Sequence, residues 1–163
     1  MDKEKPNFKQ TGLLAAASNT LNSVVLKYTE PLDSRLPPAN MRYRLYTFKD
    51  GTIVGDPLNL STQPAWLIGR DRLVADIPVD HPSCSKQHAV IQFRYVVKKV
   101  GEFGDKDARV RPYVLDLESA NGTKMNGEML PETRFVELKE GDMLMFGHST
   151  RYIIPPDING WEA

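Results

Sequence analysis

A single cysteine, Cys84, occurs among the 163 residues. One cysteine cannot form an intramolecular disulfide, and this low usage is typical of a reducing compartment. The sequence also lacks an apolar run of about 18 residues and a charged-then-apolar leader, so we expect neither a membrane-spanning helix nor a secretory signal. These absences predict a soluble protein of the cytosol or nucleus without a membrane partner.

An excess of either charge is also missing, since 21 lysines and arginines balance 21 aspartates and glutamates. A neutral chain has no general attraction to polyanions such as nucleic acid. No run interleaves aromatic with basic residues, the pattern that favours binding of single-stranded nucleic acid. Direct RNA contact is therefore disfavoured, and any anion binding has to be local.

Helical periodicity is absent too, whereas short β-type runs bounded by turn residues begin near Arg42. Their spacing predicts an all-β sandwich, and 163 residues suit a single domain with a tail. The expected strands are Arg44 to Phe48, Ala65 to Ile68, His88 to Val97, Tyr113 to Leu117, Phe135 to Leu138, Met143 to Phe146 and Tyr152 to Ile154.

One of these runs, His88 to Val97, alternates in a way that predicts a buried face. Apolar side chains at every second position fall on one side of the strand, and the polar side chains fall mostly on the other. We expect the apolar side to face the core. Its members are Ala89, Ile91, Phe93, Tyr95 and Val97.

Most connections between the runs are short. Tight turns are predicted at Lys49-Asp50-Gly51, Asn126-Gly127 and Glu140-Gly141-Asp142, because glycine and asparagine tolerate positive φ. The longer connection from Gly101 to Arg111 contains further glycines and mixed charge. We interpret it as a mobile hairpin tip between two strands.

Residues 1–40 differ in pattern from the rest of the chain, which sets the expected domain at residues 41–163. Prolines interrupt them, and they show no sustained period. Their short apolar clusters nevertheless distinguish them from a solvating linker. We interpret the cluster with Phe8, Leu13 and Leu14 as a segment that docks on a partner. For Val24 to Tyr28 two interpretations stay open, an added strand of the domain or partner docking.

Polar residues suited to bind an anion lie at the ends of three expected strands. Gly69-Arg70 ends one strand, Ser85 to His88 opens another, and Asn121 to Thr123 follows a third. Loops at one end of a sandwich cluster, so these groups are expected to converge. Arg70 offers a planar fork that matches phosphate oxygens, Ser85 a hydroxyl donor and Lys86 a compact positive charge. The pattern predicts an anion pocket.

This ordered set resembles the signature of the forkhead-associated (FHA) family. The resemblance implies a sandwich of two twisted, mostly antiparallel sheets with about eleven strands, whose loops bind phosphothreonine in partner proteins. The matching pieces are Gly69-Arg70, Ser85-x-x-His88, Asp116-Leu117-x-Ser119-x-Asn121-Gly122-Thr123 and Asn126-Gly127.

The same resemblance implies roles for individual residues. Arg70 and Ser85 are expected to contact the phosphate, and Lys86 to add a further contact. Asn121 is expected to hold the main chain of the bound peptide. The loop-supporting residues are expected to be Gly69, His88, Gly122 and Thr123.

A closer resemblance covers nearly the whole chain. Leu67 to Arg70 and Ala75 to Val90 are similar to the Smad nuclear-interacting protein and yeast pre-mRNA leakage protein group. The tail shares this similarity in Phe8, Gly12 to Leu14 and Lys27 to Pro31. That group implies a place in the pre-mRNA retention and splicing complex of the spliceosome and a nuclear location. It also implies that the tail docks on an RNA-recognition-motif subunit, with other spliceosomal proteins nearby.

One departure from the family pattern concerns Ala120, because many members carry a hydroxyl residue directly before Asn-Gly-Thr. Losing one hydrogen bond to a charged acceptor weakens binding by about 1.5 to 3 kcal/mol. This departure supports an alternative, a structural adaptor whose sandwich binds an unphosphorylated surface and whose phosphate pocket is vestigial.

Other functions are disfavoured by spacing. Ser85, His88 and Asp116 do not form a hydrolase triad, since no Gly-x-Ser-x-Gly surrounds the serine. His81 and His148 with Cys84 lack the spacing of a zinc site. We therefore expect a binding module that is not an enzyme and uses neither a metal nor another cofactor.

Overall fold

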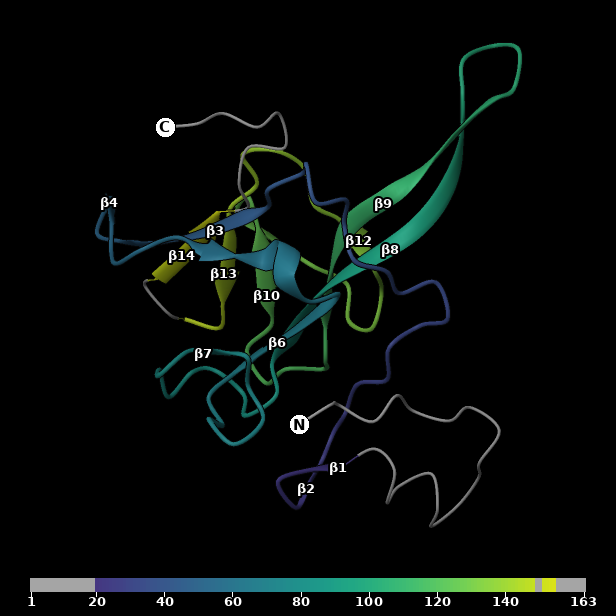
Figure 1. Cartoon of the computed structure of the whole chain (residues 1–163). Coiled ribbons are helices and arrows are strands. Elements are labelled where there is room, and N and C mark those ends of the chain that lie inside the picture. The colour runs from purple at the N-terminus through teal and green to yellow at the C-terminus, as the bar shows by residue number, and fades with distance from the viewer. Residues whose placement is uncertain (1–19, 149–150, 155–163) are drawn as a thin grey trace.

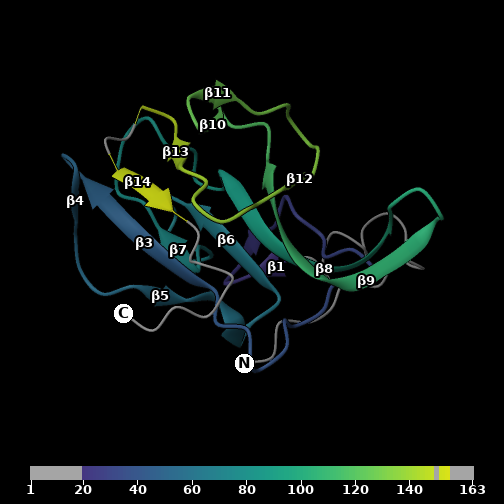
Figure 2. The ribbon, with the colours of Figure 1, turned by 90° about the horizontal axis from the view of Figure 1, so that it is seen from above.

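The computed structural model describes residues 20–148 and 151–154, in which two large β-sheets pack on one another (Figure 1, Figure 2). The strands of one sheet run in the order β11-β10-β13-β14-β3-β4, with β5 also paired to β3, and those of the other in the order β12-β9-β8-β6-β7. The first sheet comprises β3 (Arg44–Lys49), β4 (Thr52–Ile53), β5 (Leu58–Asn59), β10 (Thr123–Met125), β11 (Glu128–Met129), β13 (Leu144–Phe146) and β14 (Arg151–Ile154). The second comprises β6 (Ala65–Gly69), β7 (Ile77–Pro78), β8 (Ala89–Val100), β9 (Asp105–Asp116) and β12 (Val136–Glu137).

The all-β expectation is confirmed, and a strand lies at each of the seven predicted runs. All strand pairs in the two sheets are antiparallel except β6 with β7. The strands that the sequence did not predict are two or three residues long, too short to show a period of two. Within the described residues the only helical element is a single 3-10 turn, Leu60–Thr62, and no helix is long and apolar enough to span a bilayer.

The predicted turns are also present. Asp50 and Gly51 join β3 to β4 with φ values of 51° and 79°, and Asn126 and Gly127 join β10 to β11 with 53° and 84°. Positive φ at both central residues is the geometry of a type I′ turn, one of the two turns favoured in two-residue hairpins. Gly141 has a φ of 82° in the turn before β13.

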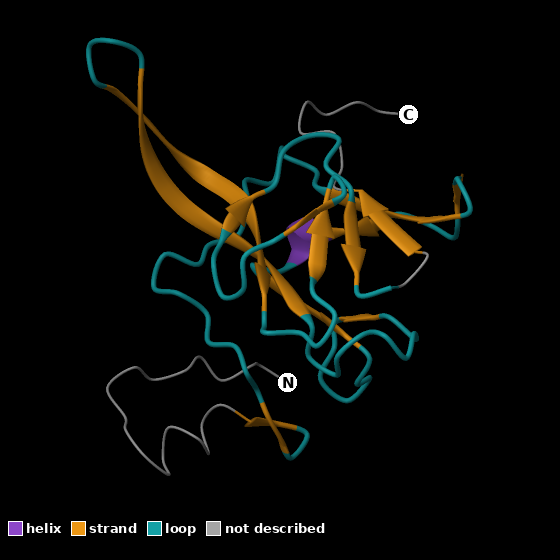
Figure 3. Ribbon diagram, turned by 180° about the vertical axis from the view of Figure 1, so that it is seen from behind, coloured by secondary structure: helices purple, strands orange, loops and turns teal. Residues whose placement is uncertain are grey.

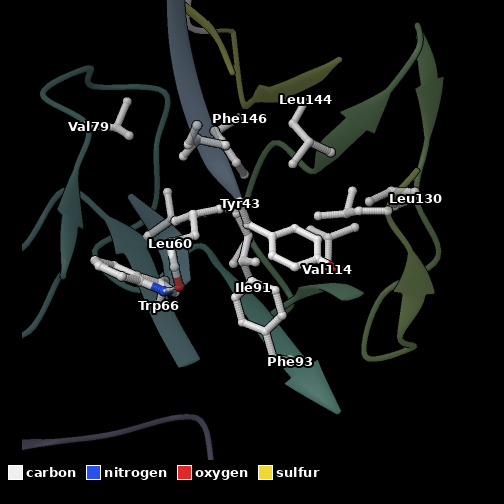
Figure 4. Close-up of a cluster of buried hydrophobic side chains, with 14 of the residues drawn as sticks. Tyr43, Leu60, Trp66, Val79, Ile91, Phe93, Val114, Leu130, Leu144 and Phe146 are labelled. Atoms are coloured by element: carbon white, nitrogen blue, oxygen red, sulfur yellow. Dashed lines mark hydrogen bonds between the residues drawn. The ribbon is translucent and has the colours of Figure 1, made fainter. Parts of the chain in front are cut away.

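The main core lies between the two sheets (Figure 4). Ile91 and Phe93 of β8 meet Phe146 of β13 and Tyr43 near the start of β3, and the Tyr43 and Phe93 rings pack edge to face with centroids 4.9 Å apart. Apolar side chains on the inner faces of both sheets are thereby removed from water, which stabilises the sandwich.

The β8–β9 hairpin extends well beyond the sandwich (Figure 1, Figure 3). The interpretation of Gly101 to Arg111 as a loop is wrong in its extent, because the turn occupies only residues 101–104 and β9 begins at Asp105. The predicted core face likewise ends at Phe93, since Tyr95 and Val97 are 37% and 52% exposed. Backbone pairing continues here without a facing sheet, so polar and apolar side chains both remain in solvent.

A second apolar cluster covers the outer face of the five-stranded sheet. Val90 and Leu115 of that sheet pack against side chains from residues 21–28, which lie outside both large sheets. Within this segment β1 (Thr20–Leu21) pairs only with β2 (Val24–Val25) and forms a separate small hairpin (Figure 1). Of the two interpretations for Val24 to Tyr28, the added strand is wrong: the segment packs on the domain without joining its sheets. The boundary at residue 41 stays a prediction, and Phe8, Leu13 and Leu14 lie outside the described residues.

Candidate functional site

Gly69, the last residue of β6, allows two backbone segments to approach closely. A Cβ placed on Gly69 would lie 2.0 Å from the carbonyl oxygen of Lys86, far inside ordinary contact. The next two residues bond to the same segment, because the Arg70 N–H donates to the Ser85 carbonyl at 3.0 Å and the Asp71 N–H donates to the Lys86 carbonyl at 3.2 Å. The absence of a side chain at Gly69 therefore brings Arg70 beside Ser85 and Lys86.

Two side chains at this junction are oriented by the backbone around them. Arg70 donates from Nε to the carbonyl of Cys84 at 3.1 Å, which leaves its Nη groups without an acceptor among the described residues. Ser85 accepts a hydrogen bond on Oγ from the Ala120 N–H at 3.0 Å. Since a hydroxyl also carries a donor, Ser85 retains its proton for an incoming acceptor. Ala120 lacks a hydroxyl, yet its backbone helps to orient Ser85.

His88 connects the Ser85 loop to the Asn121 loop. Its Nδ1 accepts from the Ser85 N–H at 3.1 Å, and Nε2 lies 2.9 Å from the Gly122 carbonyl, so Nε2 carries the proton. The ring is fully buried and packs edge to face on Phe146, with centroids 5.6 Å apart. Burial lowers the pKa of His88 below its ordinary value of 6.5, although the Gly122 carbonyl and Asp116 act in the opposite direction. These contacts are those expected of a loop-supporting residue.

A buried carboxylate organises the loop that carries Asn121. Asp116 accepts on Oδ1 from the Ser119 hydroxyl at 2.6 Å and from the Thr123 hydroxyl at 2.7 Å, and on Oδ2 from the Ser119 N–H at 3.1 Å. Between them Gly122 has a φ of 77°, a conformation that glycine adopts readily. The hydrogen bonds satisfy the buried charge and hold the loop in one conformation.

Asn121 and Ser83 connect the loop that follows β9 to the end of β13. The Asn121 amide donates from Nδ2 to the Ser83 carbonyl at 2.8 Å, while its Oδ1 has no partner within the described part of the chain. Ser83 Oγ in turn accepts from the His148 N–H at 2.8 Å and lies 2.6 Å from His81 Nδ1. Gly147, with a φ of 60°, allows this approach, since a Cβ there would lie 2.5 Å from the Ser83 carbonyl. Neither Ser83 nor Gly147 is among the predicted site residues.

These loops enclose a hollow of about 440 Å³ that brings together all four predicted binding residues, Arg70, Ser85, Lys86 and Asn121. Arg70, Lys86 and Lys27 supply three cationic side chains, and no aspartate or glutamate lines the hollow. A convergence of cations and hydrogen-bond donors without a carboxylate favours an anionic ligand. The lining residues that the sequence did not predict are Lys27, Pro82, Ser83, Cys84, Gln87 and Ala120.

Within residues 20–148, no group of three or more histidine, cysteine, aspartate or glutamate side chains is arranged to hold a metal ion. Cys84 is buried and donates from Sγ to the Phe146 carbonyl at 3.4 Å, which gives it a packing role between the loop and β13.

Comparison with known families identifies the domain that carries this hollow. Residues 66–147 match the family model described as the FHA domain. The chain belongs to the FHA domain family. The matched residues begin in β6 and end directly after β13, so they contain every residue that lines the hollow except Lys27.

Relatives of this FHA domain chain include splicing proteins. Smad nuclear-interacting protein 1 of Mus musculus is 47% identical over 149 residues, which cover 91% of this chain and 38% of that protein. Pre-mRNA leakage protein 1 of Saccharomyces cerevisiae is 32% identical over 167 residues, which cover 85% of this chain and 77% of that protein. The structure of the yeast Pml1 splicing factor, studied with its integration into the RES complex, aligns with a TM-score of 0.66 at 30% identity over 80% of this chain and 97% of that chain. The resemblances drawn from the sequence are confirmed, although the chain spans less than half of the mouse relative.

Proposed function

We propose that this FHA domain is a phosphothreonine-binding adaptor of a spliceosomal pre-mRNA retention and splicing complex. The observation that carries the proposal is the convergence of Arg70, Ser85, Lys86 and Asn121 on one hollow without a lining carboxylate. Arg70 follows the end of β6, Ser85 and Lys86 share one loop, and Asn121 lies in another. The side chains of Arg70, Ser85 and Asn121 are oriented by backbone contacts before a ligand arrives. Preorganised donors of this kind suit a phosphate dianion.

The roles of the four residues follow from their free groups. Arg70 presents its Nη groups as a fork for two phosphate oxygens, and Ser85 donates its hydroxyl proton to another. Lys86 neutralises part of the remaining charge. Asn121 accepts a peptide N–H on Oδ1, so the phosphorylated residue and the backbone beside it are read together. Binding of this kind converts no substrate, and the adaptor is not an enzyme.

The cellular assignment rests on the relatives. The yeast Pml1 splicing factor is integrated into the RES complex, and we extend this membership and a nuclear location to the present chain. The tail with Phe8, Leu13 and Leu14 docks on the RNA-recognition-motif subunit, while the sandwich binds a phosphorylated threonine on another spliceosomal protein. One chain thereby connects a constitutive partner to a regulated one.

Replacement of Arg70 tests the phosphate-binding role. The probe is a phosphothreonine peptide library with degenerate flanking positions, followed by calorimetry with one selected peptide and its unphosphorylated twin. A hydrogen bond to a charged group contributes about 1.5 to 3 kcal/mol, so Arg70→Ala should weaken binding by about two to four powers of ten. Arg70→Lys should recover only part of this loss, because an ammonium lacks the planar fork.

Arg72→Ala is the matched control, since Arg72 is an exposed arginine nearby that pairs with Asp80 and does not line the hollow. It should bind the selected peptide as the wild type does. If the wild type fails to distinguish phosphorylated from unphosphorylated peptides, the proposal is wrong. The alternative supported by Ala120, a structural adaptor with a vestigial phosphate pocket, then takes its place. Capture of the RNA-recognition-motif subunit should survive in every one of these variants.

A further inference from the structure

Lys27 lines the phosphate hollow although it lies outside the residues that match the FHA domain. It belongs to the segment that the sequence assigned to a tail, separated by about 40 residues from the first matched strand. Its arrival at the hollow is a feature of this chain and not of the matched domain.

The segment around Lys27 has one face on the domain and one in solvent. Val24, Leu26 and Tyr28 pack on the second apolar cluster, whereas Val25 and Lys27 between them are exposed. An extended backbone alternates its side chains in this way, so burial of the first three turns Lys27 outward at the level of the hollow.

Gln87 fixes the register of this segment. Its side-chain Oε1 accepts from the Lys27 N–H at 2.8 Å, and its Nε2 donates to the Val25 carbonyl at 2.9 Å, so one amide bonds the backbone on both sides of Leu26. Gln87 is only 6% exposed and follows directly after Lys86. The buried amide therefore fixes the Lys27 backbone next to the phosphate loop.

A second anchor lies immediately after Lys27. The Tyr28 hydroxyl donates to Gln92 Oε1 at 2.6 Å, and the Gln92 amide donates onward to Ser34 Oγ at 2.8 Å. Farther along, Asp33 accepts two hydrogen bonds from Arg94 at 3.0 and 2.8 Å. Lys27 is thus held between two polar anchors, and its location at the hollow does not depend on a partner protein.

The charge of the hollow exceeds what one phosphate neutralises. A phosphorylated threonine carries about −1.5 to −2 at neutral pH, whereas Lys27, Arg70 and Lys86 carry three positive charges with no lining carboxylate. We propose that Lys27 is a specificity-determining residue, which favours phosphopeptides with a second negative charge on a residue flanking the phosphothreonine. The inference rests on the proposed function and adds the chemical class of its ligand.

The test is a double-mutant cycle between protein and peptide, measured by calorimetry at low salt. Three versions of one phosphothreonine peptide are compared. They carry a glutamate, a glutamine or a phosphoserine at the same position flanking the phosphothreonine. An exposed ion pair changes affinity by up to about five-fold, so Lys27→Gln should weaken the glutamate peptide by about three- to five-fold and the phosphoserine peptide by more. It should leave the glutamine peptide unchanged within about two-fold.

Two further variants separate the effect of position from that of charge. Lys99→Gln removes an exposed lysine on the distant β8–β9 hairpin and should preserve the discrimination. Gln87→Ala removes the amide that fixes the segment, without a change of charge, and should reduce the discrimination as Lys27→Gln does. Unaltered discrimination in Gln87→Ala would show that Lys27 is not fixed by this contact and overturn the positioning argument.

The outcomes for the two proposals are distinct. If the wild type binds the glutamine and glutamate peptides equally, or if Lys27→Gln weakens both to the same degree, the specificity role is overturned while phosphothreonine binding stands. If the wild type binds no phosphopeptide at all, both proposals fail.

Discussion

Gly69→Ala tests whether close backbone approach builds the candidate site. The added Cβ would lie 2.0 Å from the Lys86 carbonyl oxygen, whereas ordinary contact begins at 3.4 Å, so the two segments have to separate. The opposing atoms are backbone, and no rotamer change can relieve the overlap. We expect β6 and the Ser85–Gln87 loop to move apart and to carry Arg70 away from Ser85.

The size of the effect follows from the contacts that the separation breaks. The bonds from the Arg70 N–H to Ser85 and from the Asp71 N–H to Lys86 contribute about 1 kcal/mol each. Overpacking of a buried site adds about 1 to 3 kcal/mol. The free energy of unfolding should therefore fall by about 3 kcal/mol or more. For a chain of this size such a loss lowers Tm by about 6 to 12 °C.

The assay is urea unfolding followed by fluorescence, with phosphopeptide calorimetry on the same preparations. Gly55→Ala is the matched control, because Gly55 has a φ of 72° but no atom within 4 Å of an added Cβ. It should lose only about 1 kcal/mol through backbone strain. A Gly69→Ala domain that is within 0.5 kcal/mol of the wild type, or more stable than Gly55→Ala, would refute the reasoning.

Two further expectations concern stability. Burial lowers the pKa of His88 below 6.5 in the folded protein. Between the folded pKa and 6.5 the unfolded chain therefore binds a proton that the folded chain does not. The free energy of unfolding should fall as the pH drops through this window, by at most about 1.4 kcal/mol per pH unit. Urea unfolding of the free protein across this range should show the slope, and an identical slope in His88→Asn would contradict the assignment. Deletion of residues 1–30 should destabilise the domain because it uncovers Val90 and Leu115, whereas deletion of residues 1–19 should preserve Tm and abolish capture of the RNA-recognition-motif subunit. Equal melting of the two truncations would show that residues 20–30 add no stability.

Much of the fold was predictable from local pattern. In the run that begins at His88, Ala89, Ile91 and Phe93 alternate onto the face that packs in the core. Glycine or asparagine marks turns that need positive φ. The short strands β7, β10 and β11 carry no such signal, since two or three residues cannot display a period. The interpretation of Asp105 to Arg111 as loop failed for a related reason, because residues 105–109 are mostly exposed on both faces of the projecting hairpin and show no apolar alternation.

The candidate site was predictable in its residue types and not in its geometry. Arg70, Ser85 and Asn121 could be chosen because an arginine fork, a hydroxyl and an amide occur in order at the ends of strands. Their orientation depends on contacts that join distant parts of the chain, such as the hydrogen bond between Ala120 and Ser85. Ala120 is an example. The sequence shows only that this position lacks a hydroxyl, whereas in the structure its backbone N–H donates to Ser85 Oγ.

The amino-acid sequence by itself determined the fold class, the family and the residue types of the candidate site, because each is expressed in local periodicity or in an ordered set of residue types. Only the tertiary structure decided where residues 20–35 lie. The bonds of Gln87 to Val25 and Lys27 span about 60 residues of sequence. No local pattern encodes such a contact, since it forms only when the outer face of the five-stranded sheet exists for Leu26 and Tyr28 to cover. Packing on that face is the physical reason that a lysine from the predicted tail lines the hollow.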